Sequence, residues 1–127
     1  MLAKDFETIL NKIIEKMLAL IAERREMYAP GEDDRLYNFK ESGRRQDCSP
    51  ERALWGMLDK HIGCLQDIIK RLDKGLPLDR SEGYISEKVG DTITYVALLE
   101  GLLMERHWSE EASKTKAVEA RGAACDG

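Results

Sequence analysis

Cysteine is scarce in this chain, and its three copies lie far apart. Cys48, Cys64 and Cys125 are odd in number, and no two of them have C-x-x-C spacing. Disulfide frameworks and structural zinc sites need paired or clustered cysteines. The sequence therefore favours neither of them, and we expect the protein to reside in the reducing cytoplasm.

Long apolar runs are also lacking. Charged residues interrupt the apolar ones from Lys4 and Asp5 onward, and no apolar stretch approaches the ~20 residues that a membrane span requires. We therefore expect no export signal and no membrane partner.

Neither sign of charge dominates. The 24 acidic and 20 basic residues are mixed along the sequence and leave a formal net charge of −4. A protein that binds DNA or RNA in bulk needs a broad cationic surface to neutralise phosphates. Bulk nucleic-acid binding is therefore not expected.

Proline is rare, with three copies in 127 residues, and the chain is 43% hydrophobic and 35% charged. This balance favours one globular domain rich in charged helices. Apolar residues recur with helical spacing over residues 3–28 and 50–72, and Ser49-Pro50-Glu51 forms a well-defined helix start. Between them, residues 29–48 form a charged connector with a short helical turn that Gly43 would end.

A third helix is expected over residues 84–107, and it is apolar on nearly every side. Three helices in a single chain cannot bury so much apolar surface. We therefore predict an all-α bundle of three main helices plus a short connector helix, completed by assembly into a dimer or tetramer. Residues 1–108 would form the domain and residues 109–127 a flexible C-terminal tail.

Two acidic residues interrupt the third helix. Glu87 and Asp91 are four positions apart, so both carboxylates project from one face of a mostly apolar helix. Such a pair needs a cation, and Mg²⁺ or Mn²⁺ suits oxygen ligands. The alternative is that both acids lie on an exposed margin, paired with Lys88 or Arg80.

The helix over residues 50–72 carries further polar candidates. Lys60 and Asp67 share a face with Cys64, so they could add a phosphate contact and a third metal ligand, unless this face is simply solvated. His61 lies within the apolar stripe, where it could contact a ligand or act as a base. A hydrogen-bonded core histidine is the alternative.

Basic and aromatic residues alternate around the connector. The basic ones are Arg24, Arg25, Arg35, Lys40, Arg44 and Arg45, and Tyr28, Tyr37, Asn38 and Phe39 lie among them. Arginines that hold phosphates beside a ring that stacks on a base would have this composition. A solvated charged loop would have it too.

The order of these elements resembles that of a known group of proteins. The segments that carry the likeness are RREMY at 24–28, DRLYNFK at 34–40, Lys60-His61, and EKVGD at 87–91 with the following residues through Tyr95. Over about residues 20–105 the chain resembles small phage and prophage proteins of the MazG-like all-α nucleotide pyrophosphatase group. The resemblance implies a four-helix type of architecture, oligomers, and Mg²⁺-dependent cleavage of nucleoside triphosphates to monophosphate and pyrophosphate.

Better-characterised members of that group hold the metal with an E-x-x-E pair on one helix and an E-x-x-D pair on the next. This chain has E-x-x-x-D at Glu87 and Asp91, and its preceding helix offers only Asp59 and Asp67. By the resemblance, Glu87 and Asp91 would be the second acidic pair. With the spacing of Lys60 and Asp67, this predicts metal ligation by Glu87, Asp91 and Asp67, and catalysis by Glu87, Asp91 and Lys60. The substrate would be held by Arg35, Asn38, Phe39, Lys40, His61 and Tyr95.

Three functions agree with these features. The first is a Mg²⁺-dependent pyrophosphohydrolase acting on a nucleotide or modified nucleotide, with the metal activating a water molecule. The second is a module that binds or sequesters a nucleotide without turning it over. The third is a helical interaction protein whose apolar helix only mediates assembly.

Overall fold

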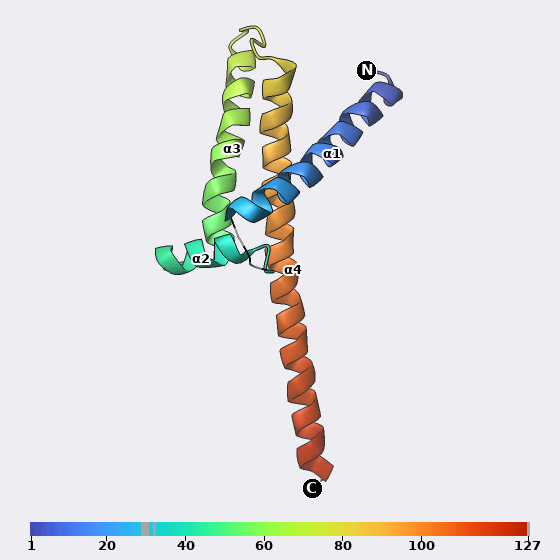
Figure 1. Ribbon diagram of the computed structural model, residues 1–127, viewed down its shortest axis with the longest axis vertical. Coiled ribbons are helices and arrows are strands. Elements are labelled where there is room, and N and C mark those ends of the chain that lie inside the picture. The colour runs from blue at the N-terminus through green and yellow to red at the C-terminus, as the bar shows by residue number, and fades with distance from the viewer. Residues whose placement is uncertain (29–30, 32, 127) are drawn as a thin grey trace.

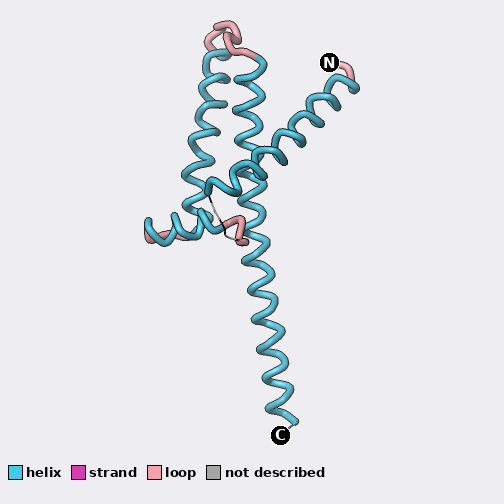
Figure 2. Tube along the Cα trace, in the orientation of Figure 1, coloured by secondary structure: helices cyan, strands magenta, loops and turns pink. Residues whose placement is uncertain are grey.

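The computed structural model of the protein describes the backbone of residues 1–28, 31 and 33–126, with the side chains of these residues except 26–28 and 124–126. Four helices follow one another, and the described residues contain no strand (Figures 1 and 2). They are α1 (Ala3–Tyr28), α2 (Tyr37–Gln46), α3 (Pro50–Asp73) and α4 (Glu82–Asp126). The predicted all-α class is confirmed.

The start of α3 is the one that its sequence predicts. Ser49 is extended, and its Oγ accepts a hydrogen bond from the backbone N–H of Arg52 at 3.1 Å. Pro50 takes the first turn, where no intrahelical donor is needed, and Glu51 adds a negative charge at the positive end of the helix dipole. The helix that begins here packs against α2.

The connector helix differs from its prediction. It ends at Gln46 rather than at Gly43, because Asp47 takes the left-handed conformation, with φ 54°, that stops the helix. Gly43 is buried within the helix, and a Cβ added there would lie 2.8 Å from the carbonyl oxygen of Cys48. The glycine therefore allows the chain to turn back tightly toward α3.

The helices form a small bundle with two projecting arms (Figure 1). The first part of α4 runs beside α3, α2 packs against α3, and α1 crosses α4 obliquely, so that its N-terminal part projects away. The core lies where α2, α3 and α4 meet. It consists of Phe39, Leu54, Leu58 and Leu102, with Met57, Ile62, Tyr95 and Leu98 among the residues packed around it.

Much of the apolar surface remains uncovered in a single chain. On α1, a strip of side chains spaced four apart is exposed; this α1 strip is Phe6, Leu10, Ile14 and Leu18, with exposed fractions between 41% and 61%. On α4, Val96 and Leu103 are each half exposed. The predicted excess of apolar surface is thus present, whereas assembly stays a prediction.

The C-terminal segment also differs from its prediction. Residues 109–126 were expected to form a flexible tail, but α4 continues through them to Asp126. Alanine, glutamate and lysine are frequent there, and all three favour helix even where no apolar stripe repeats. Every described side chain from 103 to 123 is exposed, so the extension touches little of the bundle.

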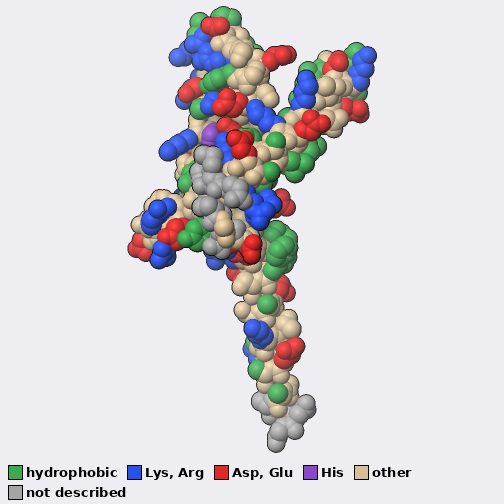
Figure 3. Space-filling view, viewed as in Figure 1, with side chains coloured by type: hydrophobic (Ala, Val, Ile, Leu, Met, Phe, Trp, Pro, Cys, Tyr) green, Lys and Arg blue, Asp and Glu red, His purple; other side chains and the backbone are tan. Residues whose placement is uncertain are grey.

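The surface agrees with the mixed charge of the sequence. Positive and negative side chains alternate over the face shown in Figure 3, without a broad region of one sign. Among the described residues, none of the helices is both long enough and apolar enough to cross a membrane.

Candidate functional site

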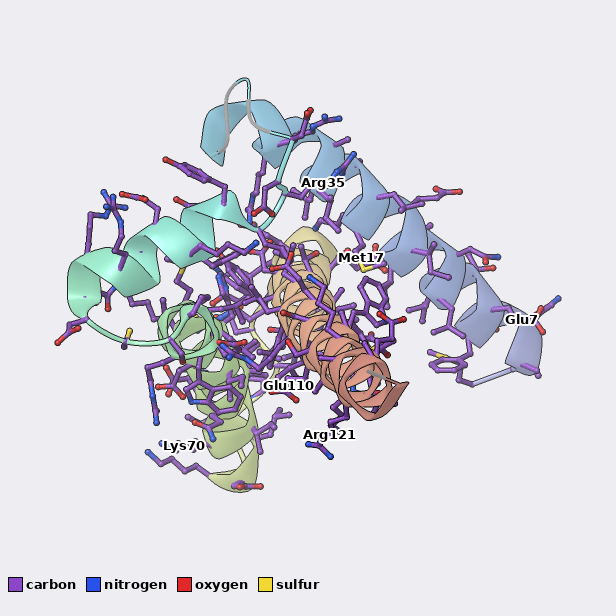
Figure 4. All side chains as sticks on the ribbon, turned by 90° about the horizontal axis from the view of Figure 1, so that it is seen from below. Glu7, Met17, Arg35, Lys70, Glu110 and Arg121 are labelled. Atoms are coloured by element: carbon purple, nitrogen blue, oxygen red, sulfur yellow. The ribbon has the colours of Figure 1, made fainter. Side chains whose placement is uncertain are left out.

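A cleft of about 260 Å³ lies where the second half of α1, the turn before α2, α3 and α4 come together. Its lining includes Ile21, Arg24, Arg25, Arg35, Asn38, Phe39, Met57, Thr94, Tyr95 and Leu98. In Figure 4, Arg35 lies beside α1 at the turn that leads into α2. Three arginines from two separate segments therefore meet at one cavity.

The three arginines make part of the lining cationic. Arg25 and Arg35 are exposed, and neither has an acidic partner among the described residues. Guanidinium groups are fixed planar donors that match the oxygens of phosphates and carboxylates. Asn38 adds an amide that both donates and accepts hydrogen bonds. This part of the lining suits an anionic ligand.

The rest of the lining is largely apolar and aromatic. The ring of Tyr95 meets that of Phe39 edge-on, with centroids 6.3 Å apart, and stacks on the His61 ring at 4.9 Å. Met57 and Leu98 complete this part of the lining. A flat, partly apolar group could pack here while its anionic end reaches the arginines.

Asp91 lies directly beside the cleft and is only 5% exposed. Its Oδ1 is 3.6 Å from Nη2 of Arg24, and its Oδ2 is 3.9 Å from Nδ1 of His61. One turn further along α4, Thr94 is fully buried and donates its hydroxyl to the carbonyl oxygen of Gly90 at 2.8 Å. Asp91, Arg24, His61 and Tyr95 thus form one contiguous polar and aromatic cluster.

The turn that carries Arg35 is held by its neighbour Asp34. Asp34 Oδ1 accepts a hydrogen bond from the Leu36 backbone at 3.0 Å, and Oδ2 accepts one from Lys40 Nζ at 2.5 Å. Lys40 Nζ also lies 2.6 Å from Oε1 of Glu105 on α4. The network connects the start of α2 to α4 and so positions Arg35.

The same network changes two pKa values. Burial alone would raise the pKa of Asp34, but the hydrogen bonds from Lys40 and the Leu36 backbone, with the charge of Lys40, outweigh burial and lower it. Burial alone would lower the pKa of Lys40, but its hydrogen bonds to Asp34 and Glu105 outweigh burial and raise it. Both groups are therefore charged at neutral pH.

The predicted substrate-binding residues separate into two sets. Arg35, Asn38, Phe39 and Tyr95 line the cleft, and His61 stacks on Tyr95 behind it. Lys40 instead lines a different pocket, together with Glu51, Glu105 and Arg106. Its ammonium group lies in the ion-pair network with Asp34 and Glu105, outside the lining of the cleft.

The predicted metal ligands do not form a cluster in one chain. Glu87 and Asp67 are exposed, Asp91 is buried beside Arg24, and no three His, Cys, Asp or Glu residues of the described part converge on one point. Lys60 is exposed and lies outside the cleft. Within one chain, the described residues thus do not form the Mg²⁺ site that the resemblance implies, and metal binding stays a prediction.

Sequence reasoning missed the pairing of Asp91 with Arg24. A buried acid on an apolar helix indicates that a cation must be near, but several arginines and lysines were equally available. It also missed Ile21 and Met57 as lining residues, because an apolar residue at helical spacing carries no signal that distinguishes a cleft from a core.

Comparison of the chain with models of known protein families, with curated proteins and with solved structures finds no significant match.

Proposed function

We propose that this protein binds a nucleotide in the cleft between α1, α2, α3 and α4. The observation that carries the proposal is that Arg24, Arg25 and Arg35 line the same cavity as Tyr95 and Phe39. A nucleotide has the two chemical parts that such a cavity complements, an anionic phosphate and a flat heterocycle.

The phosphate would lie against the arginines. Arg25 and Arg35 have no acidic partner among the described residues, so their donors are available to phosphate oxygens. The turn that carries Arg35 is fixed through Asp34 and Lys40, which reduces the entropy lost when Arg35 is ordered by a ligand. The arginines would supply most of the affinity.

The base would lie toward Tyr95, Phe39 and Leu98. Aromatic and aliphatic surface accepts any heterocycle by stacking and burial, with about 1–3 kcal/mol per stacked base. Asn38 also lines the cleft, and its amide could hydrogen-bond the edge of the base or the sugar. Nucleotides with different bases should therefore bind with similar affinity, with only a modest preference among them.

Hydrolysis to monophosphate and pyrophosphate stays a prediction from the resemblance. Within one chain, the described acidic residues do not converge on a common point. Incubation of the protein with nucleoside triphosphates and Mg²⁺, followed by measurement of released pyrophosphate, tests the prediction. Turnover that is lost in Glu87→Gln would support it.

Thermal unfolding with a panel of nucleoside mono-, di- and triphosphates tests the binding proposal. A ligand that binds only the folded state raises the melting temperature as its concentration exceeds the Kd. Arg35→Gln should abolish most of this shift, whereas Arg45→Gln removes an exposed arginine outside the cleft and should preserve it. If no nucleotide shifts the wild-type transition at millimolar concentration, the proposal is wrong.

We also propose that a second copy of the chain covers the α1 strip. Soluble monomers rarely expose contiguous apolar patches of this kind. A groove between α1 and α4 is lined by Ile9 and Ile13 of α1 and by Ile85 and Val89 of α4. Apolar surface therefore continues from α1 to α4. A bundle completed by a second chain would bury both.

A further inference from the structure

The negative charge of Asp91 needs a partner because the side chain is 93% shielded from solvent. A carboxylate that deep is strongly disfavoured unless a cation or several hydrogen bonds compensate it. Among the described residues two groups face it, Arg24 at 3.6 Å and His61 at 3.9 Å. Only the arginine carries a permanent positive charge.

A divalent cation on Asp91 would compete with this arrangement. The guanidinium of Arg24 already lies against one oxygen and the imidazole of His61 against the other. An ion bound there would be held next to a fixed positive charge, which raises its free energy. Glu87 is the other member of the predicted pair. Its side chain is exposed, so it does not lie in the buried site and could not offset the repulsion between Arg24 and a bound cation there.

We propose that Asp91 is a positioning residue, a buried counter-ion that holds Arg24 at the cleft, so that an anionic ligand is bound by guanidinium groups and not through a divalent cation. The inference rests on the proposed nucleotide binding for its ligand, and on the Asp91–Arg24 contact for its geometry. Arg24 comes from α1 and Asp91 from α4, so the pair also joins two helices that pack obliquely.

The charge of the described lining indicates the class of ligand. With Arg24 compensated by Asp91, the remaining formal charge comes from Arg25 and Arg35 and is about +2. A phosphate monoester carries about −1.5 to −2 at pH 7. A nucleoside monophosphate therefore complements the cleft without metal. The cavity of about 260 Å³ is slightly smaller than the roughly 300–1,000 Å³ usual for ligand sites, which favours a small nucleotide.

Unfolding of the ligand-free protein in EDTA tests the counter-ion directly. Arg24→Met should lower the melting temperature by several degrees, because it leaves the buried carboxylate uncompensated. The double variant Arg24→Met with Asp91→Asn should recover much of that loss, since the charge itself is gone. Strictly additive effects, or a higher melting temperature for Asp91→Asn alone, would show that Asp91 is not compensated by Arg24.

Titration with the 5′-monophosphates of adenosine, guanosine, cytidine and uridine tests the absence of a bridging metal. The Kd should change less than about twofold when Mg²⁺ replaces EDTA, and Asp91→Asn should weaken binding about tenfold by releasing Arg24. Glu87→Gln should bind as the wild type does. Binding at least tenfold tighter with Mg²⁺, and lost equally in Glu87→Gln and Asp91→Asn, would overturn the inference in favour of a metal site.

The two experiments test the proposed function and the role of Asp91 independently. If no nucleotide binds with or without Mg²⁺, the proposed function is wrong, and the unfolding of the three variants still decides whether Asp91 compensates Arg24. If nucleotides bind only with Mg²⁺, the proposed function stands and the role given to Asp91 is wrong.

Discussion

The guanidinium of Arg106 donates two hydrogen bonds to the carboxylate of Glu51, at 2.8 and 2.9 Å, across 55 positions of sequence. This bidentate pair joins α4 to the first turn of α3. Close by, Lys40 joins α4 to α2 through Glu105. Two adjacent residues of α4, Glu105 and Arg106, therefore form ion pairs with the first turns of α2 and α3.

Acid should weaken this connection. The hydrogen bonds from Arg106 lower the pKa of Glu51 below its ordinary value, against the opposing effect of burial, and the pKa of Asp34 is also lowered. A lowered folded-state pKa contributes stability above the unfolded-state pKa, and this stability is lost as pH falls through the folded-state value. We expect the melting temperature to decline below about pH 4.5.

Glu51→Gln tests the source of that decline. The variant should melt slightly lower than the wild type at pH 7, and its melting temperature should fall less steeply between pH 5 and pH 3. Glu119→Gln, on the exposed extension of α4, is the matched control and should follow the wild-type curve. A Glu51→Gln curve parallel to that of the wild type would contradict the role of the pair.

Two glycines should respond in opposite ways to alanine. A Cβ on Gly43 would lie 2.8 Å from the Cys48 carbonyl oxygen and 3.0 Å from the Pro50 nitrogen, both backbone atoms, so the turn between α2 and α3 must shift. Gly56, within α3, has open space around it. Gly43→Ala should destabilise the fold, whereas Gly56→Ala should stabilise it by about 0.5–1 kcal/mol. Urea unfolding of both variants measures the two signs, and equal effects would contradict the tight turn.

A charge on the α1 strip should disrupt assembly. Ile14→Glu places a carboxylate in the middle of the strip, and burying it against a second copy would be unfavourable. Light scattering at micromolar concentration should give a dimer or tetramer for the wild type and a monomer for the variant. Thr8 is exposed and two positions from both Phe6 and Leu10, so Thr8→Glu introduces the same charge on the opposite side of α1 and should preserve the oligomer. A monomeric wild type would refute the proposal.

Removal of residues 110–127 should leave the melting temperature almost unchanged. Their described side chains are exposed, and the hydrogen bonds recorded there join residues of the same helix. Circular dichroism should lose helical signal in proportion to the residues removed. Truncation after Glu100, which also removes the buried Leu102 and Arg106, should instead destabilise the bundle. A large loss of stability in the shorter truncation would show that the extension packs on another chain.

The sequence by itself determined the helices and most of their bounds. Apolar spacing is a local property, and the Ser49-Pro50-Glu51 start depends only on neighbouring residues, so α1 and α3 could be predicted within a residue or two. Apolar periodicity does not predict the extension of α4, because none is present there. The helix is favoured instead by the intrinsic preferences of its alanine, glutamate and lysine residues.

Only the tertiary structure decided which polar residues act together. The resemblance grouped six residues as substrate-binding, and the fold brings four of them, Arg35, Asn38, Phe39 and Tyr95, to one cleft. His61 lies behind Tyr95, and Lys40 lines another pocket. The sequence also marked Asp91 as an acid in need of a cation, yet spacing along one helix paired it with Glu87, whereas the fold pairs it with Arg24 from a helix 67 positions earlier. Compensation of a buried charge depends on distance in space, which is set by how α1 crosses α4, and no pattern within either helix contains that angle.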